Sequence, residues 1–325
     1  QKFLGKKYKK EDYIKSNDIV EVWFDSGATH TYVLEKRKDL IWPASMYLEG
    51  SDQHRGWFHS SLLEACGTRG RAPFKSILTH GFVVDGKGLK MSKSTGNIIA
   101  PEEILKKYGA DILRAWVAAS DYSEDLRLDH SILEQHAESY RKIRNTFRFI
   151  LGNLRDQKIN FDLNSKEIEK WPELEHFMLH QIFILNKNFE KYFKEYNFHK
   201  LYKELLNFCS LDLSAFYFDI RKDVLYCDDI KSKKRKICTN LLALILDILL
   251  KWFAPILSFT TEEIFQIMNS GTNSSIHLES FPKIPTNWEN KKLYEKWEKI
   301  KIIRNVVNAG IEVKRSSKDI GSSLE

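Results

Sequence analysis

The chain has 325 residues, of which 42% are hydrophobic and 29% charged, with only 7 prolines, so it can bury the cores of about two domains and is not a disordered chain. Its most apolar stretch, residues 241–250, is too short to span a bilayer, and its cysteines form no C-x-x-C pair; this argues against a membrane partner, a zinc knuckle and a disulfide framework, and fits a reducing, cytoplasmic setting. The formal net charge is +7, and residues 136–325 carry 31 Lys+Arg against 25 Asp+Glu, which predicts an anionic partner such as nucleic acid, although a lysine-rich solvated surface has the same balance.

The first 130 residues alternate between short apolar runs, polar turns and helical patterns. Residues 1–20 are polar and basic and are typical of a connector. We expect strands at 19–27, 46–48 and 77–84, and helices at 57–66, from Pro101 onward and at 111–119. This alternation predicts an α/β fold with a parallel sheet.

After about residue 130 the pattern becomes helical throughout. Apolar residues recur at helical spacing over 131–154, 174–195, 199–219, 233–252, 259–268 and 288–309. We therefore expect an all-α bundle to follow the α/β segment.

The most informative run is DGKGLKMSKSTGN, residues 85–97. It follows an expected strand and precedes an expected helix. Its lysines, serines and glycines suit a loop that grips phosphate, because ammonium groups neutralise charge on a leaving pyrophosphate and hydroxyls and backbone N–H groups supply further donors. By residue type alone, a solvated surface loop is the more common interpretation of such a run, and no Walker A motif is present.

A second polar cluster, YLEGSDQHRGWF at residues 47–58, lies between an expected strand and an expected helix. The end of a strand in an α/β sheet is the usual place for a ligand. The alternative is an ordinary capped turn with Ser51 or Asp52 at the start of the helix.

Residues 90–94 read KMSKS, and they resemble in full the signature of class I aminoacyl-tRNA synthetases. The resemblance implies a loop that closes on ATP during amino-acid activation. Lys93 is the expected catalytic contact to the ATP phosphates, and Lys90 is expected to assist less directly. Met91, Ser92 and Ser94 complete the expected ATP-binding loop.

The run GSDQHRGWF, residues 50–58, resembles the isoleucine type of this class. The resemblance implies that Glu49 and Gly50 bind the isoleucyl-adenylate, that Asp52 and Gln53 reach its ribose and adenylate, and that Trp57 shapes the pocket. Weaker matches are WFDSG at 23–27 and HGF at 80–82, and further matches are YGADILR at 108–114 and RKIRNT at 141–146. The resemblance is clear again at IGSSLE, residues 320–325.

The resemblance implies a Rossmann-like catalytic part followed by an anticodon-binding bundle. Residues 1–20 would end an inserted editing domain, 21–130 would form the C-terminal half of the catalytic domain, and 131–325 the helical domain. The expected partners are isoleucine, ATP with Mg²⁺, and tRNA(Ile), and the parent protein is expected to be a cytoplasmic monomer. Zinc would belong only to a C-terminal region that this sequence lacks.

The partner signature of the family, H-x-G-H, does not occur in the sequence. We therefore expect a fragment that is inactive alone, from a parent that attaches isoleucine to its tRNA. A non-catalytic tRNA-binding module is one alternative. A valine- or leucine-specific relative is another, against which the GSDQHRGWF run argues.

Two other features favour ordinary structural roles. His176 and His180 have metal-binding spacing but no third ligand nearby, so we interpret them as a surface pair and expect no metal site. The basic run 231–236 is interpreted as a loop or a first helical turn, with RNA contact as the alternative.

Overall fold

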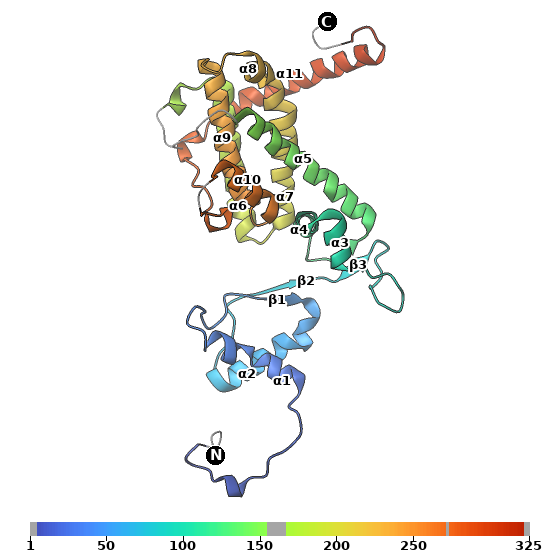
Figure 1. Ribbon diagram of the computed structural model, residues 1–325, viewed down its shortest axis with the longest axis vertical. Coiled ribbons are helices and arrows are strands. Elements are labelled where there is room, and N and C mark those ends of the chain that lie inside the picture. Colours follow the sequence, from blue (N-terminus) through green and yellow to red (C-terminus); the bar gives the residue numbers. More distant parts are fainter. Residues whose placement is uncertain (1–4, 155–166, 271–272, 322–325) are drawn as a thin grey trace. The chain divides into compact units, whose positions relative to one another are not determined.

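The computed structural model describes residues 5–154, 167–270 and 273–321. The chain divides into two compact units (Figure 1): the first contains residues 1–84 and 122–126, and the second contains 85–121 and 127–325. Within the described ranges, no helix has the length and apolarity needed to cross a membrane.

The first unit is built around a pair of parallel strands. Its elements are η1 Lys10–Asp12, α1 Val22–Gly27, η2 His30–Leu34, β1 Tyr47–Gly50, η3 Ser51–Arg55, α2 Trp57–Arg69 and β2 Ile77–His80. Strands β1 and β2 pair in parallel, from Tyr47 opposite Ile77 to Gly50 opposite His80. Helix α2 lies between them in sequence, as a crossover between parallel strands requires. The expected parallel sheet and the expected helix from Trp57 are confirmed.

The strand expected at 19–27 is wrong, because residues 22–27 form α1. The Glu21 side chain accepts a hydrogen bond of 2.7 Å from the backbone N–H of Trp23, which caps this helix. Gly27 packs tightly against α2, since a Cβ there would lie 2.5 Å from Glu64 Oε1. Helix capping and packing on α2 therefore override the β-branched composition of the segment.

The strand expected at 77–84 is two strands, β2 and β3 Val83–Asp85. The break occurs at Gly81, whose backbone N–H donates to Tyr122 O at 2.9 Å. A Cβ on Gly81 would lie 2.3 Å from Glu124 O, so no larger residue fits this approach. Strand β3 pairs instead with β4 Leu126–Leu128, and the boundary between the units runs through both strands.

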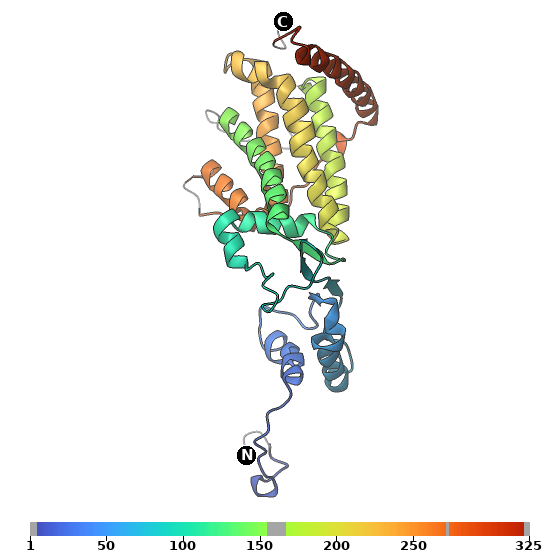
Figure 2. The same cartoon turned by 90° about the vertical axis from the view of Figure 1, so that its right-hand side faces the viewer.

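The second unit is helical, as expected, and Figures 1 and 2 show its helices packed side by side. In chain order they are α3 Pro101–Tyr108, α4 Ala110–Ala119, α5 His130–Leu154, η4 Ile168–Lys170, α6 Glu173–Lys194, α7 Phe198–Asn207, the π-helix η5 Phe208–Phe218, α8 Asp219–Cys227, α9 Lys233–Phe253, α10 Ser258–Met268, η6 Ile276–Leu278, η7 Thr286–Trp288 and α11 Lys291–Ser316. Pro101 is at the first position of α3, as its fixed φ favours. The helix expected at 199–219 continues to Cys227 through the π-helical turn.

The core of this unit surrounds α9. Both large rings at the end of this helix are buried: Phe253 meets Phe147 of α5 edge-on at 5.9 Å, and Trp252 stacks on Phe189 of α6 at 5.3 Å. Such aromatic pairs add about 0.5–1.5 kcal/mol each to the free energy gained from apolar burial. The helix expected at 233–252 is therefore the centre of the bundle.

A buried ion pair joins α6 to α8. The Glu175 carboxylate has no exposed surface, and it accepts two hydrogen bonds of 2.8 Å from the Arg221 guanidinium. The Tyr217 hydroxyl donates to the same carboxylate at 3.1 Å. Burial and the neighbouring Glu175 charge raise the pKa of Tyr217 well above its ordinary value, so the phenol remains a donor.

Helix α4 is fastened to the bundle at two helix ends. Asp111 accepts hydrogen bonds from the Thr260 N–H at 2.7 Å and the Phe259 N–H at 3.2 Å, at the start of α10. Arg114 donates to Ile256 O at 3.0 Å and Pro255 O at 2.5 Å, just after the end of α9. A carboxylate at a helix N-terminus and a cation at a C-terminus both complement the helix dipoles. Two residues of the YGADILR motif, residues 108–114, therefore have a structural role: Asp111 and Arg114 join α4 to the helical bundle.

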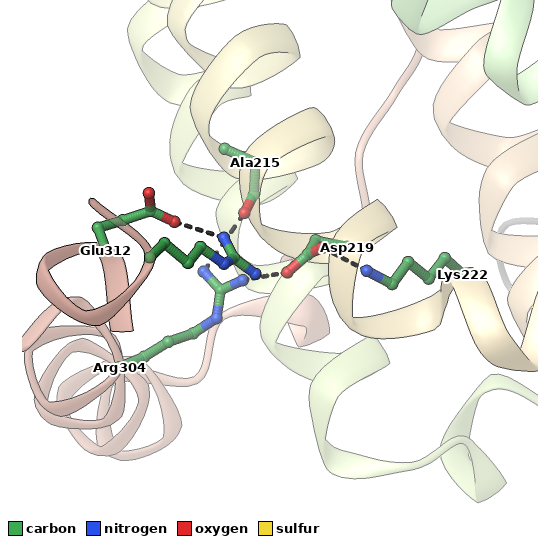
Figure 3. A network of polar contacts seen from close by, with 6 residues as sticks. Ala215, Asp219, Lys222, Arg304 and Glu312 are labelled. Atoms are coloured by element: carbon green, nitrogen blue, oxygen red, sulfur yellow. Dashed lines mark hydrogen bonds and ion pairs between the residues drawn. The ribbon is translucent and has the colours of Figure 1, made fainter. Parts of the chain in front are cut away.

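Helix α11 begins three residues later than expected because Asn290 caps it, accepting from the Leu293 N–H at 3.0 Å. Figure 3 shows Arg304 of this helix beside η5 and α8, where it donates to Ala215 O at 3.3 Å and to Asp219 Oδ2 at 2.5 Å. The resemblance at 320–325 falls mostly on residues 322–325, which lie outside the described residues.

Candidate functional site

The first cluster of candidate residues lies where β1 ends. Glu49 is exposed, and among the described residues its carboxylate has no hydrogen-bond or ion-pair partner. It lies opposite Thr79 in the parallel pair, next to Gly50 opposite His80. The carboxylate is therefore free for a ligand that approaches the end of the sheet.

Gly50 has no room for a side chain. A Cβ there would lie 2.7 Å from Asp52 Oδ1 and 3.8 Å from the His80 ring. The Asp52 carboxylate therefore lies over the backbone of Gly50, close to the end of β1. This is a local fold that only glycine permits without moving Asp52.

Gln53 and Trp57 both have structural partners. The Gln53 side-chain oxygen accepts from the Trp57 N–H at 2.9 Å and so satisfies the first turn of α2. The Trp57 indole donates to Ser26 O at 2.9 Å and stacks on Tyr47 at 4.3 Å. Tyr47 is buried, and its hydroxyl is 3.1 Å from Ser61 Oγ. The structure thus brings all five predicted adenylate residues into one strand–helix turn, and two of them also hold the turn together.

The signature loop, residues 85–97, is organised by two side chains. Asp85, at the end of β3, accepts from the backbone N–H groups of Lys87 at 3.0 Å and Leu89 at 2.8 Å. Its other oxygen accepts from Asn97 Nδ2 at 2.9 Å. Asn97 in turn accepts from the Ser92 N–H at 2.9 Å. The two ends of the loop are therefore joined by one Asp–Asn contact.

The hydroxyls of the loop form a small network of their own. Ser92 Oγ lies 3.1 Å from Ser94 Oγ and 2.8 Å from Thr95 Oγ1, and Thr95 donates to Asn97 Oδ1 at 2.6 Å. Met91 is half-buried beside them. The network fixes the backbone between the two lysines without using either lysine side chain.

Lys90 and Lys93 are both exposed, and neither pairs with a carboxylate among the described residues. Asp85, the acidic residue within the loop, instead accepts hydrogen bonds from backbone and side-chain amides. The Asn97 amide, followed by the Leu89 backbone N–H, holds the pKa of Asp85 below its ordinary value. The loop therefore presents two uncompensated ammonium groups, as an anionic ligand requires.

The start of the loop is held against α5. A Cβ on Gly86 would lie 2.1 Å from Asp129 Oδ2, and Asp129 caps α5 by accepting from the Ile132 N–H at 2.8 Å. Gly88, with φ +83, takes a left-handed conformation that favours glycine. Asp85, Asn97 and Asp129 are residues to which the sequence analysis gave no role. An acidic residue directly after a strand and an Asn at the end of a Gly/Ser-rich run were the available signals.

The two sets of candidate residues belong to different units: residues 49–57 to the first, and residues 90–94 to the second.

No group of three or more His, Cys, Asp or Glu side chains in the described ranges could hold a metal ion. The interpretation of His176 and His180 as a surface pair is wrong for His180, which is buried and accepts from the Asn290 N–H at 2.9 Å through Nδ1. Residues 233–236 form the first turn of α9, as one of the two interpretations expected.

Two family profiles match the chain. That of the class I tRNA synthetases (I, L, M and V) matches residues 1–129, and that of the anticodon-binding domain of tRNA ligases matches residues 175–325. Among curated proteins, the isoleucine–tRNA ligase of Pelagibacter ubique is 69% identical over all of this chain and 36% of its own length. That of Mesorhizobium japonicum is 48% identical over all of this chain and 32% of its own length.

Among solved structures, a ternary complex of an Agrobacterium radiobacter K84 LeuRS with tRNA and LeuAMS has a similar fold, with a TM-score of 0.61 at 17% identity. The match covers 76% of this chain and 29% of that one. The chain thus spans about a third of the length of the curated relatives, 36% of the first of them. Residues 1–129 thus belong to a class I tRNA synthetase domain, and residues 175–325 belong to an anticodon-binding domain of a tRNA ligase.

Proposed function

We propose that this chain is the part of an isoleucine–tRNA ligase that supplies the signature loop, the adenylate-binding turn and the anticodon-binding domain. In the first step, a carboxylate oxygen of isoleucine attacks the α-phosphorus of ATP, which enters with Mg²⁺, and pyrophosphate leaves. In the second step, a hydroxyl of the terminal ribose of tRNA(Ile) attacks the carbonyl of the isoleucyl-adenylate, and AMP leaves. Positioning and charge stabilisation supply most of the rate gain in such reactions.

The observation that carries this proposal is the state of the two signature lysines. The Asp85–Asn97 contact and the hydroxyl network order the loop, while Lys90 and Lys93 keep their charges unpaired within the described part of the chain. A charge that develops on the leaving pyrophosphate is stabilised most by donors that are already oriented and lack a competing partner. We assign Lys93 to the phosphates and Lys90 to a supporting role, with Met91, Ser92 and Ser94 shaping the loop.

The turn after β1 supplies the other half of the proposal. Glu49 has a free carboxylate that suits the ammonium group of an amino acid or the hydroxyls of a ribose. The Asp52 carboxylate lies over Gly50 at the end of the same strand. We assign Asp52 and Gln53 to the adenylate and Trp57 to the wall of the pocket. The 69% identity to an isoleucine–tRNA ligase favours isoleucine as the amino acid.

We further propose residues 1–20 as the end of an editing insertion, 21–130 as catalytic and 131–325 as anticodon-binding. Docking of tRNA(Ile) on the helical part follows from the net positive charge of residues 136–325. A monomeric parent and a cytoplasmic location complete the proposal, with zinc confined to regions beyond this sequence.

A non-catalytic tRNA-binding module is the second candidate. The observation in its favour is that H-x-G-H is missing from the sequence. Under the main proposal that signature comes from another part of the protein, and this chain alone does not activate isoleucine. A valine- or leucine-specific protein is less consistent with the GSDQHRGWF run.

The test compares Lys93→Ala with Lys87→Ala in the longer protein, using isoleucine-dependent ATP–pyrophosphate exchange. Lys87 is an exposed lysine of the same loop outside the signature, so the pair has matched charge and location. We expect Lys93→Ala to lower exchange at least 100-fold, the order expected for one transition-state donor, with tRNA binding unchanged. Equal exchange by both variants would remove Lys93 from the mechanism.

A further inference from the structure

Helix α5 exposes a row of arginines on one face. Arg141, Arg144 and Arg148 follow the spacing that places side chains on one stripe of a helix, and all three are exposed. The opposite face packs Ile143 and Phe147 into the core of the bundle. This packing fixes α5 within the bundle, where Figure 1 shows it beside the other helices.

The C-terminal half of this row lacks compensating acids. Nearer the start of α5, Glu138 pairs with Arg141, and Glu134 pairs with Lys107 at 3.7 Å. Arg144 and Arg148 have no carboxylate partner among the described residues. Like charges four residues apart destabilise a helix slightly, so an anionic ligand would offset this cost.

Helix α11 is richer in basic residues than α5, and several of its basic side chains pair with acids of neighbouring elements. Lys296 pairs with Glu173 at 2.7 Å, Lys301 with Asp212 at 3.2 Å, and Arg304 with Asp219. Figure 3 shows the last of these pairs, which is part of the attachment of α11 to the bundle. These three basic residues of α11 thus join the helix to the bundle, whereas Arg144 and Arg148 pair with no carboxylate of the described residues.

An exposed aromatic ring contacts α5 at Phe149, the residue that follows Arg148. Phe149 stacks on Phe218 at 4.2 Å, and the Tyr226 ring of α8 meets Phe149 edge-on at 6.1 Å. Tyr226 is 64% exposed although it touches this cluster. Asp223, one turn earlier on α8, is also exposed, so this end of the surface suits an uncharged base better than a phosphate.

We infer that Arg144, Arg148 and Tyr226 form an RNA-binding surface, with the arginines on phosphates and the tyrosine stacked on an unpaired base. Cβ atoms four residues apart on a helix are about 5–6 Å apart, so the two guanidinium groups reach neighbouring phosphates of one strand. Stacking on a tyrosine favours a single-stranded loop of RNA over an acidic peptide. The inference rests on the proposed function in its choice of tRNA, and it assigns the docking role to particular residues.

The test measures binding of tRNA(Ile) to the whole 325-residue chain by fluorescence anisotropy over a range of salt concentrations. The variant Arg144→Gln/Arg148→Gln is matched with Lys170→Gln/Lys200→Gln, which removes two exposed charges from other elements of the second unit. We expect the first variant to lower the slope of log affinity against log salt by about 1 for each arginine, and the control to leave it unchanged. Tyr226→Ala should weaken binding about 5-fold or more, with Tyr226→Phe near wild type.

Equal slopes for the arginine variant and its control would overturn the inference, because net charge alone would then explain binding. Polyglutamate that competes as well as RNA would also overturn it. A wild-type chain that does not bind tRNA would contradict both the inference and the docking role. Isoleucine-dependent pyrophosphate exchange in the longer protein reports separately on catalysis: we expect the arginine variant to leave it unchanged while raising the KM for tRNA in aminoacylation.

Discussion

The hydrogen bonds between Asp111 of α4 and the start of α10 predict how much stability the protein loses when Asp111 is replaced. Asp111 is 7% exposed, and one of its oxygens accepts from the Thr260 N–H at 2.7 Å and the Thr260 hydroxyl at 2.6 Å. Replacing it by alanine leaves a buried backbone donor without an acceptor, which costs about 1–3 kcal/mol. Loss of the carboxylate from the N-terminus of α10 adds about 0.3–1 kcal/mol. We therefore expect Asp111→Ala to lower the free energy of unfolding of the helical unit by about 1.3–4 kcal/mol.

Urea unfolding followed by far-UV circular dichroism measures this change. The matched control is Asp247→Ala on α9, whose carboxylate is half-exposed and pairs with Lys251 at 3.0 Å; it should change the free energy of unfolding by less than about 1 kcal/mol. Asp111→Asn keeps an acceptor and loses the charge, so it should lie between the two. If Asp111→Ala costs no more than Asp247→Ala, the proposed capping of α10 by Asp111 does not stabilise the protein.

Two further predictions concern charged groups with defined partners. Glu175→Ala leaves the half-buried Arg221 without its carboxylate and should lower the free energy of unfolding by about 3–5 kcal/mol; a change below about 1 kcal/mol in urea unfolding would refute it. Asp85 has a lowered pKa because the Asn97 amide and the Leu89 N–H bind its charged form. Asp85 therefore stabilises the loop fully above the ordinary pKa of an aspartate, and this stabilisation is lost as pH falls through the lowered pKa of Asp85. Hydrogen exchange of the Leu89 amide, scaled for intrinsic rate, should lose protection in that acidic range, and Asp85→Asn should remove this pH dependence.

The helices were predictable because their signal is local. Repeating apolar residues placed α5, α6 and α9 within a residue or two of their observed bounds. The strand prediction at residues 19–27 was wrong for a non-local reason, because residues 22–27 form a helix that packs on α2. The same is true of the break at Gly81, which depends on a backbone partner at Tyr122.

The sequence indicates candidate residues for the site but not the contacts that hold them in the structure. The sequence identified the signature lysines and the turn after β1. It did not reveal that Asn97 and Asp85 join the two ends of the loop, or that Gln53 caps α2. Such contacts depend on side-chain direction, which a pattern of residue types does not specify.

The central claim is that the chain carries half of an isoleucine-activating site, and amino-acid-dependent ATP–pyrophosphate exchange tests it most directly. The measurement compares the 325-residue chain alone with the longer protein that also supplies an H-x-G-H signature, with isoleucine, valine and leucine as substrates. The account predicts no exchange by the chain alone and exchange by the longer protein that is fastest with isoleucine. Isoleucine-driven exchange by the chain alone, or no isoleucine-driven exchange by the longer protein, would contradict it.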